Sequence, residues 1–180
     1  ALPFFAKKHW DCEAFEKGVS LIFCSGGDYK MYVKLLEVLR IPWVIFSDYD
    51  NPTVQSKVNS VGNHLGIADI TNDDRFILLN APIESYLVDE GYREQIEDAI
   101  FKINEPVYQN EQHRLANIAA RQTEREELRS MSDEDLISRA NNWKAKIAFI
   151  WAYSIVNHND PNRQVPEKIQ SLFTSIDQKL

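Results

Sequence analysis

The segment from residue 19 to residue 50 constrains the fold more than any other part of the chain. It begins with a continuous apolar run, residues 19–27, that ends in a glycine pair. Residues 28–40 follow with apolar side chains at a period near 3.6, which predicts an amphipathic helix. Residues 41–50 form a second apolar run. A strand, a helix and a strand in this order predict a right-handed crossover with parallel strands, and therefore an α/β fold.

Two aspartates, Asp48 and Asp50, stand at the end of the second apolar run and are followed at once by Asn51 and Pro52. Residues i and i+2 of a strand point to one side, so the two carboxylates can converge on one cation. Oxygen ligands of this kind suit Mg²⁺ or Mn²⁺. The alternative is a helix-capping turn, in which Asp50 or Asn51 caps the next helix.

A third strand is predicted over residues 75–79, after a polar segment with a short helix near residues 53–66. Glu84 follows this strand closely. The carboxyl ends of parallel strands gather at one edge of a sheet, which brings Glu84 within reach of the aspartates. An acidic residue in the first turn of a helix also complements the helix dipole without any further role.

Charged and apolar residues alternate at helical periods beyond residue 91. We therefore predict an α/β core over residues 1–91 and a helical extension over 92–180, with helices at 92–103, 107–129, 133–157 and 165–178. Lys144 and Lys146 open the most apolar of these helices. A lysine there opposes the helix dipole and favours an anion-facing role, although its stem can also simply pack beside a buried helix.

Composition limits the partners that this chain can meet unaided. Its 180 residues carry 20 Lys and Arg against 27 Asp and Glu, a net charge of −7. No general attraction to a nucleic-acid backbone follows, so a polyanion needs a basic patch, a bound cation or a partner domain. The two cysteines have neither metal-ligand nor disulfide spacing, which predicts a reducing cytoplasm.

The glycine pair Gly26 and Gly27 stands ahead of the first predicted crossover helix. Backbone N–H groups at such a place can approach a phosphate, or the pair can simply make a tight turn. The spacing of a dinucleotide fingerprint or of a Walker loop is absent.

Four pieces of sequence together resemble a known family. They are ALPFFA (1–6), the stretch from VSLIFCSGG to SDYDN (19–51), IESYL (83–87) and KAKIAFIWAYSI (144–155). In order and spacing they resemble the Toprim nuclease region of the OLD-family (overcoming lysogenization defect) ATP-dependent endonucleases, to which the Gabija nuclease subunit is also similar. The resemblance covers roughly residues 1–157.

The resemblance implies a Toprim fold, a Rossmann-like parallel sheet, and a set of site residues. Asp48 and Asp50 match the D-x-D of the family, and Glu84 matches its later glutamate. Lys144 matches a lysine ahead of an alanine-rich helix, with Lys146 as the fallback if the register slips by two.

The implied activity is metal-dependent cleavage, or nicking, of DNA in phage defence or DNA repair. Asp48 and Asp50 would hold one Mg²⁺ or Mn²⁺ ion, and Glu84 and an upstream glutamate would help to hold a second. Lys144 would stabilise charge that develops on the phosphate.

One departure from the family concerns what precedes Ala1. An E-G-x-T-E strand is expected directly before it, and an ABC-type ATPase domain that binds ATP is expected further upstream. We therefore expect this chain to be a piece of a longer protein that lacks the first Toprim strand here. The implied partners are DNA, that ATPase domain, further copies of the protein and, in a Gabija-type system, a helicase-like protein.

Two other classes of function remain open from the residues. A haloacid-dehalogenase-like phosphatase also places D-x-D after an apolar strand, with Asp48 as nucleophile and Asp50 as acid. That motif requires Thr or Val where this chain has Pro52, with Thr53 one position later. A non-catalytic scaffold, whose long helices mediate oligomerisation, is the other alternative.

Overall fold

The structure is a computed structural model that describes residues 1–24 and 28–180, with only the backbone described at residues 144 and 145. The chain divides into two compact units. The α/β unit comprises residues 2–86 and 165–180, and the helical unit comprises residues 87–164 together with Ala1. Residues 165–180 thus lie in the α/β unit, whereas the prediction from the sequence placed them in the helical extension.

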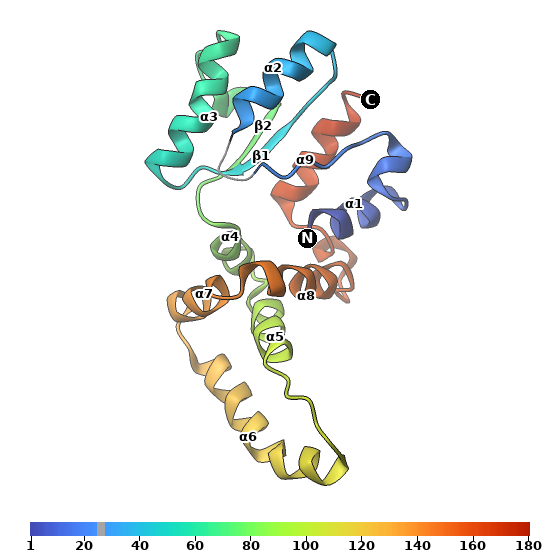
Figure 1. Cartoon of the computed structure of the whole chain (residues 1–180), viewed down its shortest axis with the longest axis vertical. Helices are drawn as coiled ribbons and strands as arrows, with labels where there is room; N and C mark the ends of the chain where they lie inside the picture. The colour runs from blue at the N-terminus through green and yellow to red at the C-terminus, as the bar shows by residue number, and fades with distance from the viewer. Residues whose placement is uncertain (25–27) are drawn as a thin grey trace. The chain divides into compact units, whose positions relative to one another are not determined.

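The α/β unit contains a parallel sheet. Strand β1 (Ile45–Asp48) pairs with β2 (Phe76–Leu79), and the register places Ile45 opposite Phe76 and Asp48 opposite Leu79. Helix α3 (Pro52–Leu65) and the short helix η3 (Ile70–Asn72) connect the two strands (Figure 1). The predicted α/β class, the parallel pairing and the strand over residues 75–79 are confirmed.

Helices cover the sheet of the α/β unit. Helix α2 (Tyr29–Leu39) contacts α3, and both contribute to one buried cluster with the strands. Its buried members include Val33, Val58, Ile45 and Phe76. Helix α9 (Glu167–Asp177) contacts α1 (Leu2–Trp10) and β2. These contacts explain why the last helix of the chain lies in this unit.

The first predicted strand is wrong over its described residues. Residues 19–24, which follow the short helix η1 (Ala14–Lys17), are in no assigned strand, and Phe23 is 92% exposed. Gly26 and Gly27 lie outside the described residues. An apolar run becomes a buried strand only where neighbouring strands bond its backbone. In the described part of the chain, the sheet contains only β1 and β2, so this run has no strand partner.

Helices α5 (Arg93–Ile103), α6 (Glu111–Ser130), α7 (Asp133–Asn141) and α8 (Lys144–Val156) build the helical unit, which follows α4 (Ile83–Asp89). A short helix, η4 (Pro161–Arg163), ends it. None of the described helices has the length and apolar character needed to cross a lipid bilayer.

The predicted helix over residues 133–157 is two helices. The Trp143 N–H donates to the carbonyl of Ala140, and the Trp143 carbonyl accepts from the N–H of Ile147 at the start of α8. The pair Asn141–Asn142 precedes this break, and asparagine is a weak helix former that favours helix ends.

Arg93 joins three elements of the helical unit. Its Nε donates to Glu97 on α5 at 2.7 Å, its Nη2 donates to the Met131 carbonyl at 2.6 Å, and its guanidinium pairs with Asp133 at the start of α7. Its side chain is only 27% exposed. Because charged hydrogen bonds of this kind each contribute about 1.5–3 kcal/mol, we expect Arg93→Ala to lower the free energy of unfolding by about 2–3 kcal/mol in urea denaturation followed by circular dichroism.

Arg114→Ala is the matched control for this substitution. Arg114 pairs with Glu111 on the surface of α6, and its side chain is 52% exposed. Surface pairs contribute little, so the control should unfold at the same urea concentration as the unsubstituted protein. Equal effects of the two substitutions would show that Arg93 does not hold the helices together.

Candidate active site at the carboxyl edge of the sheet

Asp48 is the last residue of β1, and backbone contacts hold it there. The Tyr49 N–H donates to the Leu79 carbonyl at 2.6 Å, which keeps the ends of β1 and β2 side by side. The Ser47 hydroxyl donates to the Asp48 carbonyl at 2.8 Å and is itself 2.8 Å from the Tyr29 hydroxyl on α2. The main chain at Asp48 is therefore tied to both β2 and α2.

Asn51 caps helix α3. Its side-chain oxygen accepts from the Val54 N–H at 3.1 Å, and its amide nitrogen donates to Asp50 at 2.9 Å. From the sequence, either Asp50 or Asn51 could cap this helix. The structure assigns the capping role to Asn51. Asp50 is exposed just past the strand end. An ionised carboxylate accepts several bonds, so the contact with Asn51 orients Asp50 and leaves lone pairs for another ligand.

Glu84 lies in the first turn of α4 and is 1% exposed. It stands shortly after Leu79, the register partner of Asp48. The ends of the two strands that precede the three acids are thus adjacent in the α/β unit, as the topology predicted. Across the described residues, however, no group of three or more His, Cys, Asp or Glu side chains is close enough together to hold a metal.

The donor chemistry at this edge fits a hard divalent cation. Asp48 and Asp50 offer carboxylate oxygens from one strand end. Mg²⁺ usually takes one or two protein carboxylates and keeps several waters, so a site of this kind does not require a closed cage of protein ligands.

The two lysines of α8 differ in what the structure describes. Lys144 is the first residue of the helix, and its side chain lies outside the described ones. The Lys146 ammonium lies 5.3 Å from the centre of the Trp143 ring, a distance typical of a cation–π contact at the surface. Lys146 therefore has a local packing role within the helical unit.

Ser47 and Tyr29, whose hydroxyl groups contact one another beside Asp48, were not singled out from the sequence. Ser47 is 6% exposed and is the one hydroxyl within an otherwise apolar strand core. A buried polar residue directly before D-x-D is a signal that could have been used, because buried hydroxyls require a partner. Its partner, Tyr29, could not be identified without the packing of α2 on the sheet.

Comparisons with known proteins show what the chain resembles. Residues 1–50 match the family model "Overcoming lysogenization defect protein-like, TOPRIM domain", a nuclease-type family. This match includes Asp48 and Asp50 and ends before Glu84 and Lys144. No curated protein sequence matches the chain significantly.

Among solved structures, the chain is similar to the C-terminal region of the Burkholderia pseudomallei OLD protein. The two share 18% sequence identity with a TM-score of 0.65, over 99% of this chain and 91% of that one. This similarity shows that the chain has the fold of that region. The resemblance drawn from the sequence and the Toprim α/β fold class are thereby confirmed.

Proposed function

We propose that this chain is the Toprim nuclease portion of an OLD-family ATP-dependent DNA endonuclease, which nicks DNA with the help of Mg²⁺ or Mn²⁺. The observation that carries the proposal is the position of Asp48 and Asp50 at the carboxyl end of β1, within the residues that match the OLD-like Toprim model. The function in phage defence or DNA repair, and the location in the cytoplasm, are part of the same proposal.

The acids of the chain bind and orient the metal in this proposal. Asp48 and Asp50 hold one ion, and Glu84 contributes to a second together with a glutamate from an upstream strand. Such ions polarise the phosphate and lower the pKa of a bound water. Lys144 places a positive charge against the phosphate, and Lys146 takes that role if the register slips.

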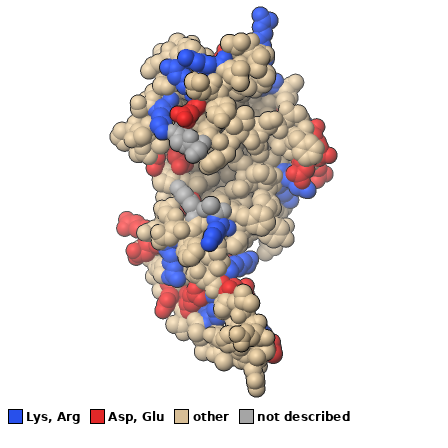
Figure 2. All heavy atoms as spheres, viewed as in Figure 1, with Lys and Arg blue, Asp and Glu red and all other residues tan. Residues whose placement is uncertain are grey.

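The charge of the protein supports a cation-assisted encounter with DNA. The net charge is −7. Figure 2 shows acidic and basic side chains interspersed on the face in view, with no continuous basic tract there. DNA binding then depends on the bound cations, on the ATPase domain of the longer protein, and on further copies of the protein that together present more than one site. A helicase-like partner is expected only in a Gabija-type system.

The phosphatase alternative is less consistent with the turn after the aspartates. Pro52 is the first residue of α3, and Asn51 caps that helix. The position that the phosphatase motif reserves for Thr or Val is therefore used to begin a helix, where proline is favoured.

Metal-dependent nicking of supercoiled plasmid DNA tests the proposal. The native polypeptide that contains this chain should convert supercoiled plasmid to open circles in Mg²⁺ or Mn²⁺, and EDTA should stop the conversion, because the acids cannot position water and phosphate without the cation. Adding Mn²⁺ in excess over the EDTA should restore the conversion to open circles. Cleavage that persists in EDTA, or a lack of cleavage in either metal with the ATPase domain and ATP present, would contradict the proposal.

A further inference from the structure

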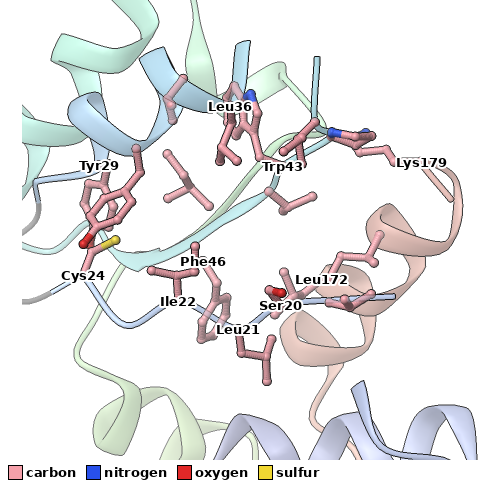
Figure 3. A pocket seen from close by; sticks show the side chains of 18 of the residues that line it. Ser20, Leu21, Ile22, Cys24, Tyr29, Leu36, Trp43, Phe46, Leu172 and Lys179 are labelled. Carbon is pink, nitrogen blue, oxygen red and sulfur yellow. The ribbon is translucent and has the colours of Figure 1, made fainter. Parts of the chain in front are cut away.

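A hollow of about 400 Å³ lies at the amino ends of the two strands of the α/β unit, opposite the edge that carries Asp48. Trp43, ahead of β1, and Arg75, directly ahead of β2, both line it. Arg40 at the end of α2 and Lys179 after α9 also contribute to its walls. Figure 3 shows the Trp43 and Lys179 side chains at the upper rim of an adjoining apolar cavity of about 320 Å³, which they line as well. The hollow thus gathers cationic side chains from three segments that lie far apart in the sequence.

The side chains that line this hollow carry an excess of positive charge. They include one carboxylate, that of Glu37, and three cations, Arg40, Arg75 and Lys179. Three positive charges against one negative charge give a balance of +2, whereas the whole chain carries −7. The Glu37 carboxylate also accepts a hydrogen bond from the Trp43 indole N–H at 2.7 Å. An anion in this hollow therefore meets a net attraction that the chain as a whole does not offer.

Two of the three cations are held in place by acids outside the lining of the hollow. Arg75 donates from Nε and Nη2 to Asp73 at 2.9 and 2.7 Å, and its guanidinium lies 5.0 Å from the centre of the Trp43 ring. The Lys179 ammonium lies 2.5 Å from Asp74. A guanidinium has five N–H donors and an ammonium has three, so both groups keep donors for a further ligand. Because these cations are already ordered, a ligand loses less free energy in fixing them.

Arg40 occupies a backbone position that favours glycine. It follows the last turn of α2 with a left-handed conformation, φ 55° and ψ 37°, which an arginine rarely adopts. A cation near a helix C-terminus interacts favourably with the helix dipole. An arginine one position earlier would do so without the left-handed backbone, so the dipole alone does not explain this residue. Its side chain adds the third cation to the lining of the hollow.

A phosphate monoester has the chemistry that matches this lining. It carries a charge of about −1.5 to −2 at pH 7 and presents three acceptor oxygens. Guanidinium groups suit phosphate because their paired N–H groups match two of its oxygens. A carboxylate offers one charge and two oxygens, and so leaves part of the positive charge unmatched. Ile41 and Pro42, which also line the hollow, provide an apolar wall for the group that carries the phosphate.

We propose that this hollow binds a phosphate monoester through Arg40, Arg75 and Lys179. The phosphate comes from the 5′ end of a DNA strand or from a free phosphate, and the experiment separates these two sources. Trp43 and Asp48 are five residues apart, about 16 Å in an extended chain, so one phosphate does not contact both the hollow and the acids of the proposed metal site. The two sites can therefore fail separately.

Fluorescence anisotropy tests the proposal with a short oligothymidylate that carries fluorescein at its 3′ end and either a phosphate or a hydroxyl at its 5′ end. The native polypeptide that contains this chain is titrated in EDTA, so that no metal ion contributes a phosphate contact, and at about 0.15 M salt, which screens weak surface attraction. The 5′-phosphorylated strand should bind at least about 10-fold more tightly, the ratio that corresponds to one charged hydrogen bond. Equal affinity of the two strands, together with no binding of inorganic phosphate in isothermal titration calorimetry, would overturn the proposal.

Calorimetry with inorganic phosphate also identifies the source of the phosphate. Inorganic phosphate that binds as tightly as the phosphorylated strand, and displaces it, would support the site and assign it to a free phosphate. Much weaker binding of inorganic phosphate than of the phosphorylated strand would support the site and assign it to the DNA end.

Arg40→Gly keeps the test independent of misfolding. Glycine is favoured at a left-handed helix end, so this variant should melt at or above the temperature of the unsubstituted protein, while its affinity for the phosphate ligand should fall at least about 10-fold. Lys34→Gln is the matched control, because Lys34 is an exposed cation of the same helix that lies outside the lining of the hollow. This control should bind as tightly as the unsubstituted protein. An equal loss of affinity in both variants would overturn the proposal, since it would assign the binding to general electrostatic attraction.

Discussion

Asp48→Asn should reduce the rate of plasmid nicking by the native polypeptide about 100- to 1,000-fold, the loss typical of removing one charged group that stabilises a transition state. Asparagine keeps the shape of the side chain and removes the negative charge that binds the cation. The backbone bonds around residue 48 run through Tyr49 and Ser47 and are unchanged. A thermal melt of the variant checks that a loss of nicking does not come from unfolding.

Asp11→Asn is the matched control for this experiment. Asp11 is an exposed aspartate far from the strand ends in sequence, with a left-handed backbone (φ 54°) that asparagine also adopts readily. This control should nick plasmid at the unsubstituted rate. Full activity of Asp48→Asn in both Mg²⁺ and Mn²⁺ would remove the strand-end aspartates from the mechanism and leave the scaffold function as the remaining alternative.

Glu84→Gln should lower nicking about 100-fold while the protein stays folded. The reason is that the amide cannot supply the charge that a second divalent ion requires, although it fits the same space in the first turn of α4. Glu84 is 1% exposed, so its environment is set by the protein rather than by water. Nicking rates over a range of Mn²⁺ concentrations would measure the effect, and part of the loss should be recovered at high Mn²⁺.

Glu94→Gln is the control that distinguishes metal binding by Glu84 from a favourable interaction of its charge with the helix dipole. Glu94 is also an acidic residue in a first turn, that of α5, but it is exposed. Both substitutions remove a favourable charge from a helix N-terminus, so only a site role predicts that Glu84→Gln alone loses activity. If both variants nick at the unsubstituted rate and Glu84→Gln merely unfolds at a lower temperature, Glu84 serves stability alone.

Local patterns predicted a large part of this fold. The 3.6-residue period marked α2, and the apolar runs that end in turn residues marked β1 and β2. The acids at the strand ends followed from the parallel crossover, since that topology brings carboxyl ends together whatever the surrounding residues are. The capping role of Asn51 was left open because Asp and Asn are nearly equal as caps, and only the observed contact with Val54 decides between them.

The sequence by itself determined that residues 29–39 form a helix and that Asp48, Asp50 and Glu84 follow strands, because these properties depend on residues close together in the chain. Tertiary structure alone decided the state of residues 19–24 and the packing of α9 beside α1 and β2. A strand needs hydrogen-bonding neighbours, and a helix needs a surface that matches its apolar face. Both are supplied by distant segments, so no local pattern records whether they are present.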